Sequence, residues 1–384
     1  MLLHSESAGM AYSFAMRKSI ATVVALTLGL AGIGAAAPGP PARNVILITL
    51  DGVRWQELFN GPERGLLGRD EKAITESSSY KRFWRDTAEA RREALMPFFW
   101  TVAARQGQVF GDPARGSLAH VTNGLWFSYP GYSEMLAGVA DPRVDSNDAI
   151  PNPNVTVLEW LNRQPGFRGR VAAFGGWTVL SSIVAAARGG FPVGEGNRPV
   201  PAPSSDRERA INDLTNDLPR LWNGNQVDAP YMQAALECLR ERRPRVLYVM
   251  LGETDEWAHE KRYDRYLDAI YRGDRFIRTV WETVQRTPGY ANATALILAT
   301  DHGRGDAAAD WTDHGQKVPA AERTWIAVMG PGAPALGVRA SSTVSAAQVA
   351  ATLATLVGED FRRAVPAAAP ALPDIGVRAA AMVR

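Results

Sequence analysis

The 384-residue sequence has very little cysteine, with Cys238 as its single example. One thiol cannot form an internal disulfide, and Cys238 has no metal-ligand spacing around it. We therefore expect a buried thiol with a structural role. Histidine is also scarce, because the chain contains five. Any clustering of histidines is therefore informative.

The chain has no strong excess of charge. A net charge of +2 and an isoelectric point near 8.7 lack the basic excess that is typical of nucleic-acid-binding proteins. We therefore expect no nucleic acid polymer as a partner. The N-terminal apolar run, residues 20–33, is too short and too rich in glycine for a comfortable membrane span. With 46% apolar and 21% charged residues, the composition is that of an ordinary globular protein.

The N-terminus has the order of a secretory signal. A positively charged pair follows Met16, then comes the apolar run, and then small residues through Ala37. This order predicts a signal peptide over residues 1–37, cleaved near its end, with translation starting at Met16. No cysteine follows for a lipid anchor, and no twin arginine precedes the run. We expect a secreted or periplasmic protein without a membrane span, and an uncleaved N-terminal anchor is the alternative.

Apolar, β-branched runs alternate with helical patterns along the chain. Runs without polar alternation are typical of strands that are buried on both faces. They are found at 44–50, 170–174, 245–251, 294–300 and 324–329. The helical patterns are found at 96–105, 155–163, 206–222, 231–242, 263–285 and 345–356. This alternation predicts an α/β fold with a largely parallel central sheet and helices on both faces.

We predict one domain over residues 44–363, preceded by a proline-rich linker at 38–43. Two stretches interrupt the alternation: residues 61–95 are rich in charge, and residues 178–204 are rich in Gly, Pro and Ser. Both are interpreted as insertions, which form either lids on the loop side of the sheet or solvated surface. Residues 364–384 are rich in Ala and Pro and are expected to form a loosely ordered tail.

Acidic residues and histidines follow three of the predicted strands. Ligands bind at the carboxyl ends of the strands in open α/β sheets, so these residues are candidates for a site. The first strand ends in Asp51, the 245–251 strand leads to Asp255 and His259, and the 294–300 strand ends in Asp301-His302-Gly303, with His314 further on. Three of the five histidines fall in these segments.

Each segment alone has an ordinary explanation. Asp51-Gly52 could be a turn, and Asp255 and His259 could share a solvated helix face. A carboxylate beside an imidazole at the end of a core strand is costly, however, unless the pair is hydrogen-bonded or binds a metal. Aspartate and histidine suit zinc, and six ligands are more than one ion normally takes. Two ions about 4 Å apart can clamp the attacking and leaving oxygens of a displacement on phosphorus.

A nucleophile for such a displacement is offered by Ser128, which precedes Pro130 and opens an apolar helix. A helix N-terminus favours an anion there. The alternative is that Ser128 only caps the helix, and Ser133 is a competing cap and a competing nucleophile. The aromatic residues around Ser128 could stack a nucleobase or aryl group, or could pack in the core. They are Trp126, Phe127, Tyr129 and Tyr132.

The order of these motifs resembles the alkaline-phosphatase superfamily, and within it the nucleotide pyrophosphatase/phosphodiesterase-type branch. The resemblance runs from about Asn44 to His314. It implies a hydrolase with two divalent ions, zinc being expected. One ion would be held by Asp51, Ser128, Asp301 and His302, and the other by Asp255, His259 and His314. Ser128 would attack phosphorus and form a covalent phosphoserine, which water would then hydrolyse.

The sequence departs from this branch at two positions. The branch typically has Thr as the nucleophile and Asn three residues later, whereas this chain has Ser128 and Gly131. A phosphate contact must then come from elsewhere, and Asn123 is a candidate. Trp126 and Tyr129 are further candidates for substrate contacts. Sulfatases of the superfamily have Arg four residues after the nucleophile, where this chain has Tyr132, which disfavours a sulfatase.

The resulting prediction is an exported, metal-dependent phosphoric ester hydrolase, either a phosphodiesterase or a phosphomonoesterase, that acts on a small-molecule phosphate ester. The alternatives are a sulfatase or phosphonate hydrolase of the same superfamily and a non-catalytic metal-binding protein.

Overall fold

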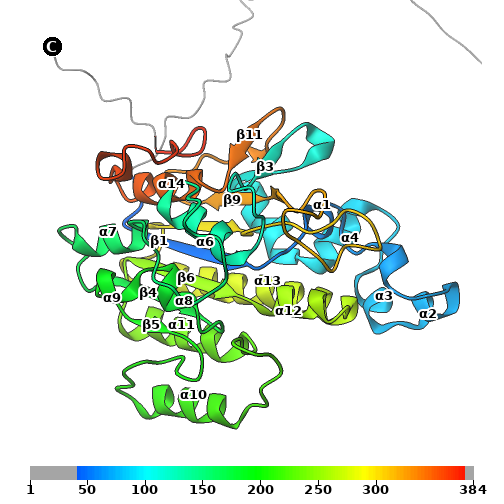
Figure 1. Cartoon of the computed structure of the whole chain (residues 1–384), viewed down its shortest axis with the longest axis horizontal. Coiled ribbons are helices and arrows are strands. Elements are labelled where there is room, and N and C mark those ends of the chain that lie inside the picture. Colours follow the sequence, from blue (N-terminus) through cyan, green and yellow to red (C-terminus); the bar gives the residue numbers. More distant parts are fainter. Residues whose placement is uncertain (1–40, 377–384) are drawn as a thin grey trace, which may run out of the picture. The chain divides into compact units, whose positions relative to one another are not determined.

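The computed structural model describes residues 41–376, so the predicted signal peptide and residues 377–384 lie outside the described part. Its core is an eight-stranded sheet in the order β10-β2-β9-β7-β1-β6-β4-β5 (Figure 1). The strands are β1 (Asn44–Leu50), β2 (Gly107–Phe110), β4 (Val171–Gly175), β5 (Val193–Gly194), β6 (Val246–Leu251), β7 (Thr294–Ala299), β9 (Ile326–Met329) and β10 (Gly337–Val338). Each of the five predicted strands is therefore present.

The sheet is largely parallel, as predicted. β1 lies near its centre and pairs in parallel with β6 and β7, and β4 pairs in parallel with β6 and β5. One strand, β9, is antiparallel to both β7 and β2, which the sequence did not reveal. A second sheet has the order β11-β3-β8, with β3 (Leu118–His120), β8 (Arg323–Thr324) and β11 (Thr343–Ser345).

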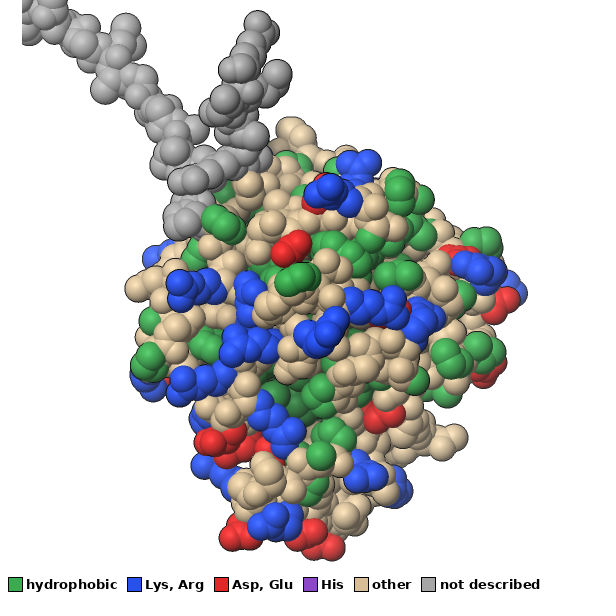
Figure 2. Space-filling model, turned by 90° about the vertical axis from the view of Figure 1, so that its left-hand side faces the viewer, with side chains coloured by type: hydrophobic (Ala, Val, Ile, Leu, Met, Phe, Trp, Pro, Cys, Tyr) green, Lys and Arg blue, Asp and Glu red, His purple; other side chains and the backbone are tan. Residues whose placement is uncertain are grey.

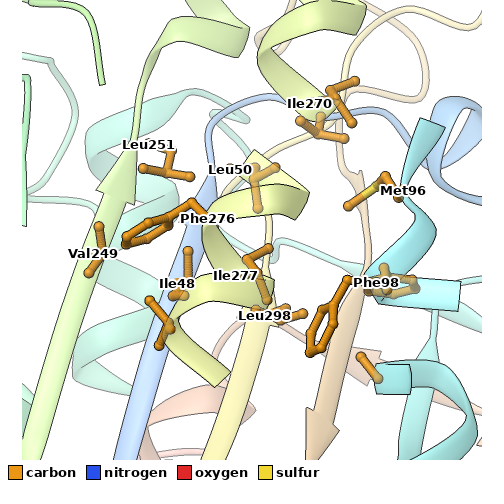
Figure 3. Packing of buried hydrophobic residues seen from close by; sticks show 14 of the residues in the cluster. Ile48, Leu50, Met96, Phe98, Val249, Leu251, Ile270, Phe276, Ile277 and Leu298 are labelled. Atoms are coloured by element: carbon orange, nitrogen blue, oxygen red, sulfur yellow. The ribbon is translucent and has the colours of Figure 1, made fainter. Parts of the chain in front are cut away.

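Helices cover both faces of the large sheet because alternate residues of each strand point to opposite sides. Ile46, Ile48 and Leu50 of β1 belong to one hydrophobic cluster, whereas Val45 and Leu47 belong to another. In Figure 3, Ile270, Phe276 and Ile277 of α13 (Tyr263–Arg286) lie over Ile48, Leu50, Val249, Leu251 and Leu298 of the strands. The same face carries α11 (Ala229–Glu241), and the other carries α6 (Ser128–Ala137), α7 (Val157–Arg163) and α14 (Gln348–Leu356).

Most predicted helices are present, with two differences. Residues 99–103 form a π-helical turn that leads into α5 (Ala104–Gln106), in place of the regular α-helix predicted at 96–105. The helix predicted at 206–222 ends earlier, because α10 spans Asp206–Asp217. Leu218 is extended there since it precedes Pro219, whose ring disfavours the helical conformation in the preceding residue.

The two predicted insertions contain regular structure. Residues 61–95 follow α1 (Trp55–Asn60) and form η1 (Arg64–Leu66), α2 (Glu71–Glu76), α3 (Ser78–Phe83) and α4 (Ala88–Leu95). This segment is attached to α13, where Phe83 packs on Tyr271 and Arg82 pairs with Asp268 at 2.7 Å. Residues 178–204 contain α8 (Leu180–Ile183), α9 (Ala186–Gly189) and the edge strand β5.

The first part of the predicted tail is packed rather than loose. Leu372 and Ile375 are buried, and the Gly376 amide donates a hydrogen bond to the Gly332 carbonyl at 3.0 Å. The prediction of a loosely ordered tail is therefore wrong for residues 364–376, because these apolar side chains lie on the core. Cys238 is buried, as predicted, and burial raises the pKa of its thiol to about 12.

Basic residues mark the edge of the sheet where the parallel strands begin. Arg43, Arg170 and Arg245 directly precede β1, β4 and β6. Figure 2 shows the left-hand side of Figure 1, where many Lys and Arg side chains lie among hydrophobic ones and no histidine is visible. The clustered acidic residues and histidines lie at the opposite edge. No helix of residues 41–376 is long and apolar enough to cross a membrane.

Candidate metal centre

Three buried ligand-type side chains, Asp51, Asp301 and His302, form a cluster that we call the inner group. Asp51 follows β1, and Asp301-His302 follow β7 after one intervening residue. Because β1 and β7 pair in parallel, their carboxyl ends meet. His302 Nε2 lies 3.3 Å from Asp51 Oδ1 and 3.5 Å from Asp301 Oδ2.

Asp255, His259 and His314 form a second cluster, the outer group. Asp255 and His259 lie one turn apart on α12 (Glu253–His259), as the sequence predicted, and α12 follows β6 after one intervening residue. His259 Nε2 lies 3.2 Å from Asp255 Oδ2 and 3.0 Å from His314 Nε2. The exposed fractions of the side chains are 15% for Asp255, 42% for His259 and 13% for His314, so the outer group is the more open of the two.

His302 joins the two groups. Its Nε2 lies 3.8 Å from Asp255 Oδ1, and Asp255, His302 and His314 form a second set whose ligand atoms converge. The resemblance assigned His302 to one ion only, whereas its ring nitrogen lies within reach of both groups. The two ligand groups are therefore adjacent.

Ser128 lies against the inner group. It is the first residue of α6, and its Oγ is 3.3 Å from His302 Nε2 and 3.5 Å from Asp51 Oδ1. It does not cap the helix, because the N-cap residue is Phe127. The competing Ser133 Oγ instead accepts a hydrogen bond from Asn152 Nδ2 at 3.0 Å. The fold therefore brings Ser128, and not Ser133, to the ligand cluster.

Two further side chains hold Asp51, and sequence reasoning missed both roles. The buried Tyr132 hydroxyl donates a hydrogen bond to Asp51 Oδ2 at 3.0 Å, and Thr254 Oγ1 donates to the Asp51 carbonyl at 2.6 Å. Tyr132 was a candidate for an aromatic wall, but it is fully buried. Its spacing of one helical turn from Ser128 could have indicated that both side chains face Asp51.

The proposed substrate contacts at Asn123 and Tyr129 have other partners. Asn123 Oδ1 accepts hydrogen bonds from two backbone amides of its own loop, and its Nδ2 donates to Glu134 Oε2 at 3.1 Å. The Tyr129 hydroxyl donates to the Ile150 carbonyl at 2.6 Å, and the residue is buried. Both polar groups are therefore engaged in the fold. Trp126 is half-buried, and its substrate contact stays a prediction.

A different asparagine lies beside Ser128. The exposed Asn147 accepts a hydrogen bond at its Oδ1 from the Tyr129 amide, which directly follows Ser128, at 2.9 Å. No sequence signal pointed to Asn147, because it lies in an irregular loop far along the chain from Ser128.

The space around position 131 explains why this residue is glycine. A Cβ atom built there would lie 2.5 Å from the Asp301 carbonyl oxygen. The first turn of α6 therefore packs directly against the backbone that carries Asp301 and His302. The asparagine that is typical of the branch does not fit at this position unless that backbone shifts.

The inner group has more negative charge than its hydrogen bonds balance. Burial, and then the charge of Asp51, raise the pKa of Asp301 to about 8, and Asp301 Oδ2 has no hydrogen-bond partner in the described residues. Burial alone would lower the pKa of His302, but Asp301 and Asp51 raise it to about 9. His302 Nδ1 lies 2.8 Å from the Gly303 carbonyl, to which it donates, so Nε2 faces the carboxylates. A proton or a metal ion must therefore lie between them.

The surroundings of the outer histidines favour the neutral form, which binds metals. Burial, and then the charge of His302, lower the pKa of both His259 and His314. A neutral imidazole offers a lone pair to a metal ion. His314 Nδ1 is buried without a hydrogen-bond partner in residues 41–376.

The spacing of the ligand atoms fits metal ions. A tetrahedral zinc ion with ligands at roughly 2.0–2.1 Å separates them by about 3.3 Å. In the inner group the separations from His302 Nε2 are 3.3 Å to Asp51 and 3.5 Å to Asp301, and Ser128 Oγ is 3.3 Å away. In the outer group His259 Nε2 lies 3.0 Å from His314 Nε2 and 3.2 Å from Asp255 Oδ2, and His314 Nε2 lies 3.7 Å from Asp255 Oδ1. The inner group therefore has the donor set and the spacing of a metal site, and Asp255, His302 and His314 form the second converging set, next to which His259 lies.

Comparison with protein families gives one match. The family described as type I phosphodiesterase / nucleotide pyrophosphatase matches residues 66–371, which is more than half of the chain. The chain belongs to this family. This match confirms the branch that the resemblance indicated, the nucleotide pyrophosphatase/phosphodiesterase type. A search of curated proteins gave no match.

Solved structures share the fold at low sequence identity. The structure of Ps i-CgsB in complex with k-i-k-neocarrahexaose is 16% identical, with a TM-score of 0.52, and the alignment covers 86% of this chain and 75% of that chain. Phosphonate monoester hydrolase of Agrobacterium radiobacter is 13% identical over 83% of this chain and 74% of its own, with a TM-score of 0.48. TAB5 alkaline phosphatase with bound Mg is 12% identical over 84% and 100%, with a TM-score of 0.46.

The predicted fold class, an α/β fold with a largely parallel central sheet and helices on both faces, is confirmed, and Ps i-CgsB shares this fold. The family identifies the chain as a phosphodiesterase-type hydrolase.

Proposed function

We propose that the protein is an exported, metal-dependent phosphoric ester hydrolase, a phosphodiesterase or phosphomonoesterase, that acts through a phosphoserine at Ser128. One observation supports this most. Ser128 Oγ is at the first residue of α6 and lies 3.3 Å from His302 Nε2 and 3.5 Å from Asp51 Oδ1. A hydroxyl in that place lies next to the inner group and to the positive end of a helix dipole.

The centre would hold two divalent ions, which we take to be zinc because the ligands are carboxylate oxygens and imidazole nitrogens. Asp51, Ser128, Asp301 and His302 would hold the inner ion, and Asp255, His259 and His314 would hold the outer ion. When bound, the ions would activate the serine hydroxyl and neutralise charge on the phosphoryl group.

The chain's own groups carry out the transfer. Ser128 Oγ forms a bond to phosphorus while the bond from phosphorus to the leaving oxygen breaks, and water then breaks the Ser128–phosphate bond. The N-terminus of α6 stabilises the phosphate. Asn147, whose Oδ1 is held by the Tyr129 amide, offers its Nδ2 to the phosphate in place of the asparagine that Gly131 excludes.

The function is tested by measuring turnover of three aryl esters by zinc-loaded protein: a phosphate monoester, a phosphate diester and a sulfate. We expect turnover of one or both phosphorus esters. Turnover of the sulfate alone would assign the protein to the sulfatases, and an aryl phosphonate ester tests the phosphonate hydrolase. No turnover of any ester by protein with bound metal would support the non-catalytic alternative.

The covalent step is tested by quenching the reaction with acid and mapping the phosphopeptide. We expect phosphate on Ser128, and the intact mass should show an unmodified serine rather than formylglycine. Phosphate on Ser133 would contradict the assignment.

Export is supported by the leader pattern, which lies outside the described residues. N-terminal sequencing of protein from its native host should start near residue 38. A native chain that begins at Met1 or Met16 would contradict export with cleavage.

A further inference from the structure

Arg304 lies directly after Asp301-His302-Gly303, and its side chain is fully buried. Burial of a charged guanidinium is costly unless its donors are hydrogen-bonded. Its Nε donates to the Gly52 carbonyl at 3.1 Å and its Nη1 to the Thr312 carbonyl at 2.5 Å. Its Nη2 donates to Asp255 at the backbone carbonyl, 3.2 Å away, and at the carboxylate Oδ1.

The acceptors of Arg304 share one property, which is that each belongs to a segment that carries a ligand of the centre. Gly52 follows Asp51, Asp255 belongs to the outer group, and Thr312 precedes His314 by two residues. Arg304 itself follows His302 by two residues. One planar group therefore joins the four segments from which the two ligand groups come.

The close approach of Arg304 depends on glycine at position 52. Gly52 has a φ of +58°, and a Cβ atom there would lie 2.9 Å from both Nε and Nη2 of Arg304. The turn after β1 is therefore shaped to admit the guanidinium. This contact also ties the end of β1 to α12 through Asp255.

Arg54 is a second fully buried arginine, and its partners differ. It pairs with Glu57 and Glu63, and its Nη1 donates to the Gly305 carbonyl at 3.2 Å. None of these acceptors belongs to the inner or outer group. Burial and ion pairing alone therefore do not account for the position of Arg304.

We propose that Arg304 is a positioning residue for the outer ion. Its hydrogen bond to Asp255 Oδ1 orients the carboxylate so that Oδ2 faces His259, whose Nε2 lies 3.2 Å away. Its hydrogen bond to the Thr312 carbonyl holds the loop that carries His314. Lysine cannot make these contacts at once, because its ammonium is a point charge without the planar fork. The inference rests on the proposed two-ion centre.

The test measures zinc binding to the chelator-treated full chain by calorimetric titration, with elemental analysis after gel filtration. Wild type, Arg304→Gln, Arg304→Lys, His259→Ala and Arg54→Gln are compared. The wild type should bind two ions. In Arg304→Gln one ion should bind about 10–100-fold more weakly, the usual effect of losing an outer-shell partner. The ion that it weakens should be the one that His259→Ala, which removes an outer ligand, weakens more strongly.

The lysine variant should lie between the wild type and Arg304→Gln, since it keeps the charge but loses the fork. Arg54→Gln, which loses an equally buried guanidinium, should melt at a lower temperature but bind both ions as the wild type does. If Arg304→Gln does not fold, the comparison of Arg304→Lys with Arg54→Gln decides the question.

Unchanged affinity for both ions in the Arg304 variants would overturn the inference. It would also be overturned if the affinities for both ions fell equally and Arg54→Gln showed the same fall. Fewer than two ions in the wild type would instead overturn the proposed two-ion centre. The two failures are thereby distinguished.

Discussion

The inner and outer groups are built in different ways. Asp51, Asp301 and His302 lie at the ends of two neighbouring core strands and are buried. Asp255, His259 and His314 lie on a short helix and an irregular loop, and His259 is 42% exposed. The strand ladder sets the inner positions, whereas the outer positions depend on contacts with other elements.

The anchoring of α12 shows this dependence. Asp228 lies on another segment, and its carboxylate accepts hydrogen bonds from the Gly252 and Glu253 amides at the start of α12, at 2.8 and 3.2 Å. Glu253 in turn pairs with Arg272 of α13 at 2.6 Å. The helix of the outer group is therefore held by a buried polar network, which can be altered without touching the inner group.

The largest effect is expected for Ser128→Ala. Loss of a covalent nucleophile costs on the order of 10³-fold or more in turnover, even when the rest of the site remains. The fold and much of the bound metal should be retained, because the carboxylates and imidazoles are unchanged. Turnover of an aryl phosphate and metal content are measured together.

The matched control is Ser133→Ala, which removes a hydroxyl from the same helix at a buried position that contacts Asn152. It should lose far less turnover than Ser128→Ala. Full activity in Ser128→Ala would show that the inner group lacks the nucleophile.

A comparison of His302→Ala with His259→Ala should separate the two groups. His302 Nε2 lies within 3.8 Å of both Asp51 and Asp255, so its loss should weaken the binding of both ions. His259 contacts only the outer group, so its loss should weaken one ion. Both losses should exceed the roughly 10–100-fold effect of an outer-shell change. Elemental analysis after gel filtration gives the ion count, and identical counts in the two variants would contradict a shared His302.

Gly131→Asn restores the residue that is typical of the branch and should nevertheless reduce stability and turnover. Its Cβ would lie 2.5 Å from the Asp301 carbonyl oxygen, and overpacking of this kind costs about 1–3 kcal/mol. Gly124→Asn is the control, since Gly124 has a φ of +73°, which asparagine tolerates, and open space around its Cβ position. Urea unfolding measures both. A Gly131→Asn variant as stable as the wild type would show that the inner group can shift.

The smallest effect is expected from Asp228→Asn and depends on pH. Burial, and then the charge of Glu253, raise the pKa of Asp228 well above 3.8 in the folded protein. The folded state therefore binds this proton more tightly than the unfolded chain, so the contribution of Asp228 to stability is largest at low pH. It is lost as the pH rises through the folded pKa. Asparagine does not titrate. The free energy of unfolding of the variant, relative to that of the wild type, should therefore increase as the pH rises.

Metal-free protein is used for this urea unfolding series. The control is Asp274→Asn, because burial raises the pKa of Asp274 to about 6 and its carboxylate accepts hydrogen bonds from Phe98 and Phe99, far along the chain from α12. It should show a pH effect of the same sign. Only Asp228→Asn should also lower the affinity for the outer ion. An unchanged ion affinity in that variant would contradict the inference that Asp228 anchors α12.

The clustering of Asp51, Asp301 and His302 could be predicted because fully apolar strands have a clear signature, and their ends are therefore visible in the sequence. The same reasoning placed Asp255 and His259 on one helix face. The strands β2, β3 and β5 were missed because they have two to four residues, too few for a period to show. The reversed direction of β9 was missed because pairing is decided by partners elsewhere in the chain.

The sequence by itself determined the layered α/β architecture, the strand-end position of Asp51, Asp301 and His302, and the choice of Ser128 as a candidate. Each of these follows from local patterns. Only the tertiary structure decided that Asn123 supports its own loop, that Asn147 lies beside Ser128 and that Arg304 joins the ligand segments. A polar side chain acquires such a role from the partners that folding brings to it, and those partners are distant in the sequence.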